Sequence, residues 1–90
     1  MKKEIKEIKK IIFRLCQEAP NLEIIHWLIA IDNCFENDEF LIEEAENLRW
    51  RLQALNWQNF NTKRLVMAIE PVLIYYGVVS KDKKWIKKKL

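Results

Sequence analysis

Residues 2–18 read KKEIKEIKKIIFRLCQE and contain the pattern that decides the fold class. Their apolar side chains recur every three or four positions, at Ile5, Ile8, Ile12, Leu15 and Cys16. This spacing predicts an amphipathic helix with one buried stripe. Cations at the same spacing on the opposite side predict an exposed basic face, which comprises Lys3, Lys6, Lys10 and Arg14.

Turn-forming residues are scarce in the rest of the chain, which extends the helical prediction to all of it. One Gly and two Pro in 90 residues are too few for a β-sandwich or barrel, which needs turn residues about every 8–12 positions. Half of the residues are apolar, so a chain of this size can bury a core without a metal or a disulfide. We therefore predict a single all-α domain over residues 1–90, a compact bundle of four to five helices.

Two more helices are expected in the first two thirds of the chain. Residues 22–35 are apolar around most of a helix circumference, which predicts a central, largely buried helix. A polar turn at residues 36–39 follows, with Asp38 as the cap of a third helix from residue 39 to about residue 55.

A fourth helix is expected from residue 61 to residue 76. Asn61 or Thr62 can cap its start, and Gly77 ends it. Pro71 should kink or split this helix, because proline lacks the backbone N–H that helical hydrogen bonding requires.

The tail from residue 78, VVSKDKKWIKKKL, has two alternative predictions. It forms either a short β-hairpin that turns at residues 80–83, or a loop and a final helical turn. A hairpin after the fourth helix would resemble the wing of a winged-helix domain over about 30 residues. A recognition helix must present polar or basic side chains to a DNA groove, and this helix offers only Lys63, Arg64 and Glu70.

The third helix has two apolar faces. One faces the core and consists of Leu41, Ala45, Leu48, Leu52 and Leu55. Trp50, Ala54 and Trp57 project to the opposite side, because successive residues of a helix are about 100° apart. Either the chain folds back and covers these tryptophans, or they belong to a protein interface made of Arg49, Trp50, Arg51 and Trp57.

Charge is segregated along the chain. Residues 1–14 hold six bases and two acids, residues 15–48 hold nine acids and no Lys or Arg, and residues 81–89 hold six Lys and one Asp. The basic ends either fold against the acidic middle or bind nucleic-acid phosphates. The nucleic-acid site would then comprise Lys3, Lys6, Lys10, Arg14, Lys81, Lys83, Lys84, Lys87 and Lys88. Trp85 would stack on bases or hold the tail in place. The tail is too short for firm membrane anchoring.

Residues for catalysis are few: one His, one Ser, one Thr and two Cys. No catalytic pattern emerges from them, and a zinc site built from Cys16, Cys34 and His26 would lack a fourth ligand. We interpret the cysteines as reduced core residues and His26 as a hydrogen-bonding residue at a helix edge. The prediction is a protein that is not an enzyme and has no cofactor.

Two functions are compatible with these features. The first is a subunit or accessory factor of a larger nucleoprotein assembly that contacts nucleic-acid backbone through its basic ends. In size, helical content and lysine-lined faces the chain resembles the small subunits of CRISPR effector complexes, which is an analogy of architecture. The alternative is an inhibitor, antitoxin or adaptor that docks a partner or a second copy through Trp50, Trp57 and the acidic surface.

The absence of a signal peptide or a membrane-spanning run predicts a cytoplasmic location.

Overall fold

The computed structural model describes residues 1–82, 84 and 85. This part of the chain is mostly helical, as predicted. Its α-helices are α1 (Lys2–Glu18), α2 (Leu22–Asp32), α3 (Ala45–Trp57) and α4 (Lys63–Tyr75). A small antiparallel sheet of β1 (Phe35–Glu36) and β2 (Glu39–Phe40) and a 3-10 helix η1 (Ile42–Glu44) connect α2 to α3.

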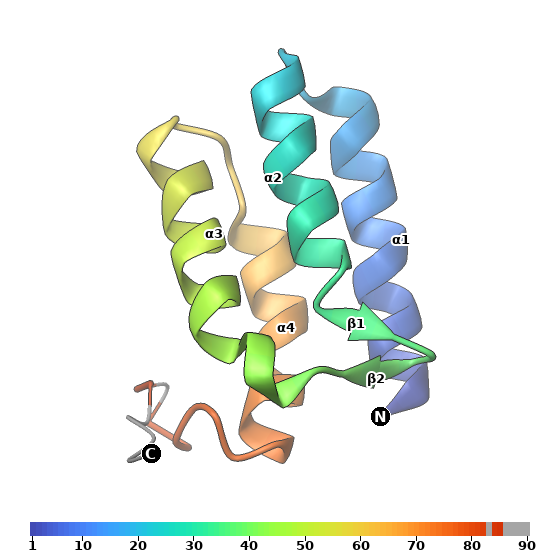
Figure 1. The fold of residues 1–90 in the computed structure, drawn as a ribbon, viewed down its shortest axis with the longest axis vertical. Coiled ribbons are helices and arrows are strands. Elements are labelled where there is room, and N and C mark those ends of the chain that lie inside the picture. Colours follow the sequence, from blue (N-terminus) through green and yellow to red (C-terminus); the bar gives the residue numbers. More distant parts are fainter. Residues whose placement is uncertain (83, 86–90) are drawn as a thin grey trace.

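The four α-helices of the described residues pack around one core. α1 packs against α2 and α4, and α2 packs against α3. The α1–α2 and α3–α4 connections lie at one end of the molecule, while the N-terminus and the β-hairpin lie at the other (Figure 1). Within the described residues, no helix is both long and apolar enough to cross a membrane.

Each helix contributes an apolar stripe to this core. The prediction for α1 is confirmed: the helix spans Lys2–Glu18, and Ile5, Ile8 and Ile12 are buried. The largest fully buried side chains of the other helices are Ile24, Leu28, Ile31, Leu48, Leu55, Leu65, Ile69 and Val72.

The predicted burial of the second helix is wrong. Only one face of α2 is buried, whereas Leu22 is 82% and Ile29 51% exposed. The reason is that α1 and α3 contact α2 and leave its remaining surface open. The helix also ends at Asp32, before the predicted residue 35.

The prediction that a helix begins at residue 39 is also wrong, because residues 35–40 form a β-hairpin. Phe35 pairs with Phe40, and the two turn residues have positive φ angles, 52° for Asn37 and 60° for Asp38. Positive φ at both central positions is typical of tight hairpin turns, and Asn and Asp tolerate it. Asp38 therefore lies in the turn and does not cap a helix. α3 begins later, at Ala45.

The fourth helix is continuous through Pro71, so the prediction that it splits into two short helices is wrong. Pro71 cannot donate to the carbonyl of Met67, four residues earlier. Both residues are exposed, so water can satisfy this carbonyl without breaking the helix.

Gly77 ends this helix, as predicted. Its N–H donates to the carbonyl oxygen of Ile74 at 3.0 Å, and the N–H of Val78 donates to that of Leu73 at 2.9 Å. These two bonds form a Schellman motif, which requires a residue with positive φ at the glycine position. Gly77 has φ 74°.

The described part of the tail agrees with the hairpin alternative. Val79 and Trp85 form an antiparallel bridge, and the N–H of Ser80 donates to the carbonyl oxygen of Lys84 at 2.8 Å. Trp85 is half-buried and packs against the core, so it holds the described part of the tail against the helices.

Candidate interaction surfaces

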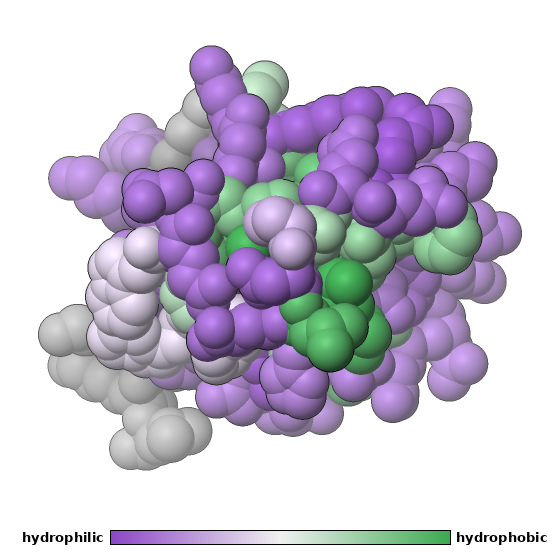
Figure 2. Space-filling view, turned by 90° about the horizontal axis from the view of Figure 1, so that it is seen from above, coloured by the Kyte–Doolittle hydropathy of each residue, from purple (hydrophilic) through white to green (hydrophobic). Residues whose placement is uncertain are grey.

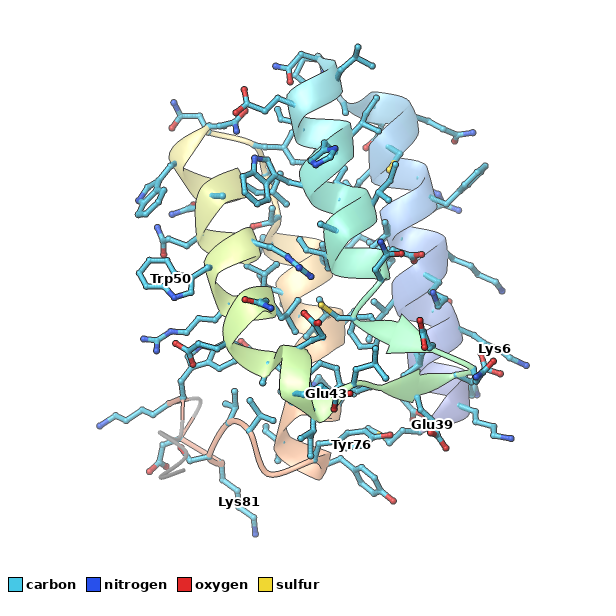
Figure 3. The ribbon with its side chains drawn as sticks, in the orientation of Figure 1. Lys6, Glu39, Glu43, Trp50, Tyr76 and Lys81 are labelled. Atoms are coloured by element: carbon cyan, nitrogen blue, oxygen red, sulfur yellow. The ribbon has the colours of Figure 1, made fainter. Side chains whose placement is uncertain are left out.

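Two exposed tryptophans lie on α3. Trp50 and Trp57 are seven residues apart, so two helical turns place them on the same face. Their ring centroids are 6.4 Å apart, and the residues are 58% and 67% exposed. The described chain therefore does not fold back over them. Trp50 points away from the neighbouring helices (Figure 3).

These tryptophans border a groove between α2 and α3. Its volume is about 400 Å³, and its lining residues, which we call the tryptophan groove, are Glu23, Trp27, Trp50, Ala54, Trp57 and Gln58. Glu23 is the acid among the described residues that line the groove.

Trp27 is a residue of this groove that the sequence analysis missed. It is half-buried and packs against the core from α2. One signal in the sequence was available: Trp27 comes four positions after Glu23, so both lie on the same face of the helix. Because Glu23 is polar, this face could have been recognised as exposed. The prediction that α2 is largely buried concealed this signal.

Arg51, predicted at the interface, lies instead between α2 and α3. Its Nη1 atom donates to the carbonyl oxygen of Ala30 at 2.8 Å and to Sγ of Cys34 at 3.3 Å, and it lies 3.6 Å from a carboxylate oxygen of Glu44. Arg51 is thus a structural contact and does not line the tryptophan groove.

Arg49, the other predicted interface cation, contacts the tail. Its guanidinium lies 5.6 Å from the ring centroid of Trp85, within the range of a cation–π contact. It also pairs with Glu46, three residues earlier, at 3.8 Å.

The two cysteines have raised pKa values. Burial raises the pKa of the Cys34 thiol, and the charge and hydrogen bond of Arg51 offset only part of this effect. Burial also raises the pKa of Cys16, and the negative charge of Asp32 adds to it. Both groups are therefore protonated thiols at neutral pH, the form that is a poor nucleophile.

The predicted basic face of α1 is present. Lys3, Lys6, Lys10 and Arg14 are all exposed. Part of the basic N-terminal segment also pairs with the acidic middle of the chain. The ammonium group of Lys9 lies 3.2 Å from a carboxylate oxygen of Asp32, and that of Lys6 lies 4.0 Å from Asp38.

The described tail lysines do not extend this basic face. Lys81 and Lys84 are exposed, but Lys81 projects from the bottom of the molecule, whereas Lys6 projects from its right side (Figure 3). Lys83, Lys87 and Lys88 lie outside the described residues. The described parts of the two basic ends thus form separate surfaces.

A second groove lies between α1 and α4. It has a volume of about 500 Å³, and its lining residues, which we call the basic groove, are Ile11, Arg14, Leu15, Glu18, Phe60, Asn61, Lys63, Arg64 and Met67. The two grooves are formed by different pairs of helices, and both lie toward the end where these helices are connected. Seen from that end, hydrophobic atoms lie in the middle of the surface with hydrophilic side chains around them (Figure 2).

We find no match to this chain among protein-family models, curated proteins or solved structures. Within the described residues, no group of three or more His, Cys, Asp or Glu side chains is placed to hold a metal ion. What the chain binds must therefore be inferred from the chemistry of its surfaces.

Proposed function

We propose that this protein is a non-enzymatic helical module that binds a partner protein through the tryptophan groove. One observation carries the proposal. The rings of Trp50 and Trp57 contact each other although both residues are more than half exposed, and a third tryptophan, Trp27, lines the same groove. Tryptophan is enriched among the residues that dominate binding energy at interfaces, and clustered exposed aromatics mark interaction sites. We infer a single cytoplasmic bundle of four to five helices as the scaffold.

The lining of the groove favours one kind of partner. Indole faces attract cations, and the carboxylate of Glu23 adds a negative charge at the groove. Arginine and lysine also have aliphatic stems that can pack on aromatic rings. We therefore expect a partner segment that presents arginine or lysine among apolar side chains.

Site-specific photo-crosslinking in cells tests this function. A benzophenone amino acid placed at position 57 should crosslink to one protein, because this position lies in the groove. The same probe at position 75 is a matched control, since Tyr75 is 68% exposed and Trp57 67%, but Tyr75 does not line the groove. The crosslink at position 57 should disappear when Trp50 is replaced by Ala. Equal crosslinking from both positions would contradict the proposal.

The captured protein can then be tested in purified form. The double variant Trp50→Ala, Trp57→Ala should lose binding while its melting temperature stays close to that of the unchanged protein. Loss of stability in the same variant would instead assign both rings to the core. Sedimentation of the purified protein alone shows whether the partner is a second copy.

A second candidate function is the nucleoprotein role, favoured by the exposed row of cations on α1. Fluorescence anisotropy with labelled single- and double-stranded oligonucleotides at several salt concentrations tests it. Phosphate contacts give a log–log slope of about −0.9 per contact on duplex and about −0.7 on single strands. The variant Lys6→Glu, Lys10→Glu, Arg14→Glu should abolish binding, whereas Lys81→Glu, Lys84→Glu tests the tail separately. Unchanged binding would remove the α1 cations from the site.

A further inference from the structure

We infer that the basic groove is a second docking site, and that it binds an acidic amphipathic segment of another partner protein. The inference goes beyond the tryptophan groove and does not depend on it. A module with two such grooves would connect two partners.

The floor of the basic groove is apolar and partly open. Ile11 is buried, Leu15 and Phe60 are half-buried, and Met67 is 62% exposed. Met67 is unbranched and flexible, so it can adapt to the shape of an incoming side chain. This floor can receive aliphatic side chains.

The rim of the groove has three exposed cations, Arg14, Lys63 and Arg64. None of the ion pairs found among the described residues includes any of them. Glu18 is the acid among the described lining residues. The groove therefore carries three positive charges and one negative charge.

Two of these cations lie where a positive charge is energetically unfavourable. Lys63 and Arg64 lie in the first turn of α4, which contains no acidic residue. The N-terminal end of a helix is the positive end of its dipole, so cations there are unfavourable and anions are favoured. An acidic ligand would compensate both the side chains and the helix end.

An apolar floor with a cationic rim fits an acidic amphipathic peptide better than a nucleic acid. Nucleic-acid bases bind mainly by stacking on aromatic faces, whereas most of this floor, Ile11, Leu15 and Met67, is not aromatic. An amphipathic helix would place its apolar face on the floor and its carboxylates at the rim. The inferred ligand is such a helix with Leu or Ile on one face and Asp or Glu beside it.

A labelled peptide can serve as the probe. The probe is a fluorescein-labelled peptide of about four helical turns, with Leu at positions i, i+3, i+4 and i+7 and mostly Glu elsewhere. We expect saturable binding by fluorescence anisotropy. In a ¹⁵N NMR titration, the backbone amide signals of Leu15, Asn61 and Met67 should shift, while that of Ala54 in the tryptophan groove should not.

Charge-reversal variants show whether binding occurs in the groove. Arg14→Glu with Arg64→Glu should weaken peptide binding by at least about tenfold, because two rim cations become acids. The matched control Lys3→Glu with Lys10→Glu makes the same change in net charge on exposed residues outside the groove. It should change the affinity by less than about twofold. Met67→Ala should weaken binding without any change of charge.

Several results would overturn the inference. These are no binding of the probe, equal weakening by both charge-reversal pairs, equal binding of a scrambled peptide that lacks the apolar face, and displacement of the probe by a lower concentration of oligonucleotide than of unlabelled peptide. The Trp50→Ala, Trp57→Ala variant should bind the probe normally. Failure at the tryptophan groove and failure at the basic groove are thereby distinguished.

Discussion

The guanidinium group of Arg51 in α3 donates a 2.8 Å hydrogen bond to the carbonyl oxygen of Ala30 in α2. Ala30 lies in the last turn of α2, where carbonyl groups have no partner within the helix. Arg51 therefore fastens α3 to the C-terminal end of α2. This contact helps to hold the two helices that form the tryptophan groove.

Replacement of Arg51 by Ala should lower the free energy of unfolding by about 2 kcal/mol, since a charged donor is lost and its acceptors are partly buried. Urea denaturation followed by circular dichroism measures this change. The matched control is Arg49→Ala, because Arg49 makes a more exposed ion pair and one cation–π contact. Its loss should be smaller, about 0.5–1 kcal/mol. Equal losses for the two variants would contradict the structural role of Arg51.

The thiol of Cys34 should make the protein less stable at alkaline pH. Burial raises its pKa in the folded state above the ordinary value of 9.0. The unfolded chain therefore loses this proton at a lower pH than the folded protein does. The contribution of the Cys34 thiol to the free energy of unfolding is therefore fully present below pH 9.0. It is lost as pH rises through the folded-state pKa.

Urea denaturation at a series of pH values from neutral to alkaline measures this effect. In the Cys34→Ala variant, the free energy of unfolding should fall less as pH rises. Lys and Tyr also titrate at alkaline pH, but they are present in both proteins, so their contributions cancel when the variant is compared with the unchanged protein. Cys16→Ala should have a smaller effect, because Cys16 is only partly buried. If the pH dependence of Cys34→Ala equals that of the unchanged protein, the raised pKa is not linked to stability.

The helices with a one-sided pattern could be predicted from the sequence. The apolar stripe of α1 determines which face is buried, and its helix bounds agree with the prediction. Gly77 ends α4 because a positive φ is needed there. Both features depend on local chemistry, which the sequence contains.

Features that depend on neighbouring helices were not predictable in this way. The exposure of Leu22 and Ile29 follows from which sides of α2 are contacted by α1 and α3. The strands at residues 35–40 are two residues long each, too short for an alternating pattern to be recognised. Their signal was the Asn37–Asp38 pair, which suits a tight turn.

The candidate site was only partly predictable for the same reason. Trp50 and Trp57 follow from the spacing within one helix, but Trp27 joins them only through the packing of α2 on α3. Arg51 is next to Trp50 in sequence, yet a rotation of about 100° per residue points it toward α2. The prediction that Arg51 belongs to the interface was wrong because it relied on the position of Arg51 next to Trp50 in the sequence.

Replacement of Pro71 by Ala should stabilise the protein. The helix is already continuous at this position, so Ala can add the missing hydrogen bond to the carbonyl of Met67. We expect a gain of about 1 kcal/mol, less than the full penalty of an interior proline, because Pro also restricts the unfolded chain. Thermal unfolding measures it, and the exposed control Met67→Ala should have a much smaller effect. A lower melting temperature for Pro71→Ala would show that the proline ring makes a needed contact.

Replacement of Gly77 by Ala should lower the free energy of unfolding by about 1 kcal/mol, because Gly77 has a φ of 74°, which side chains with a Cβ atom disfavour. Apart from its two neighbours in the chain, no residue has a heavy atom within 4 Å of a Cβ atom added there, so a clash with the surrounding structure contributes nothing to this loss. The variant Gly77→Asn is the matched control, since asparagine tolerates the left-handed region better than alanine. Chemical denaturation should therefore find the unchanged protein most stable, Gly77→Asn intermediate and Gly77→Ala least stable. A loss for asparagine as large as for alanine would mean that the side chain itself, and not the backbone conformation, disturbs the end of α4.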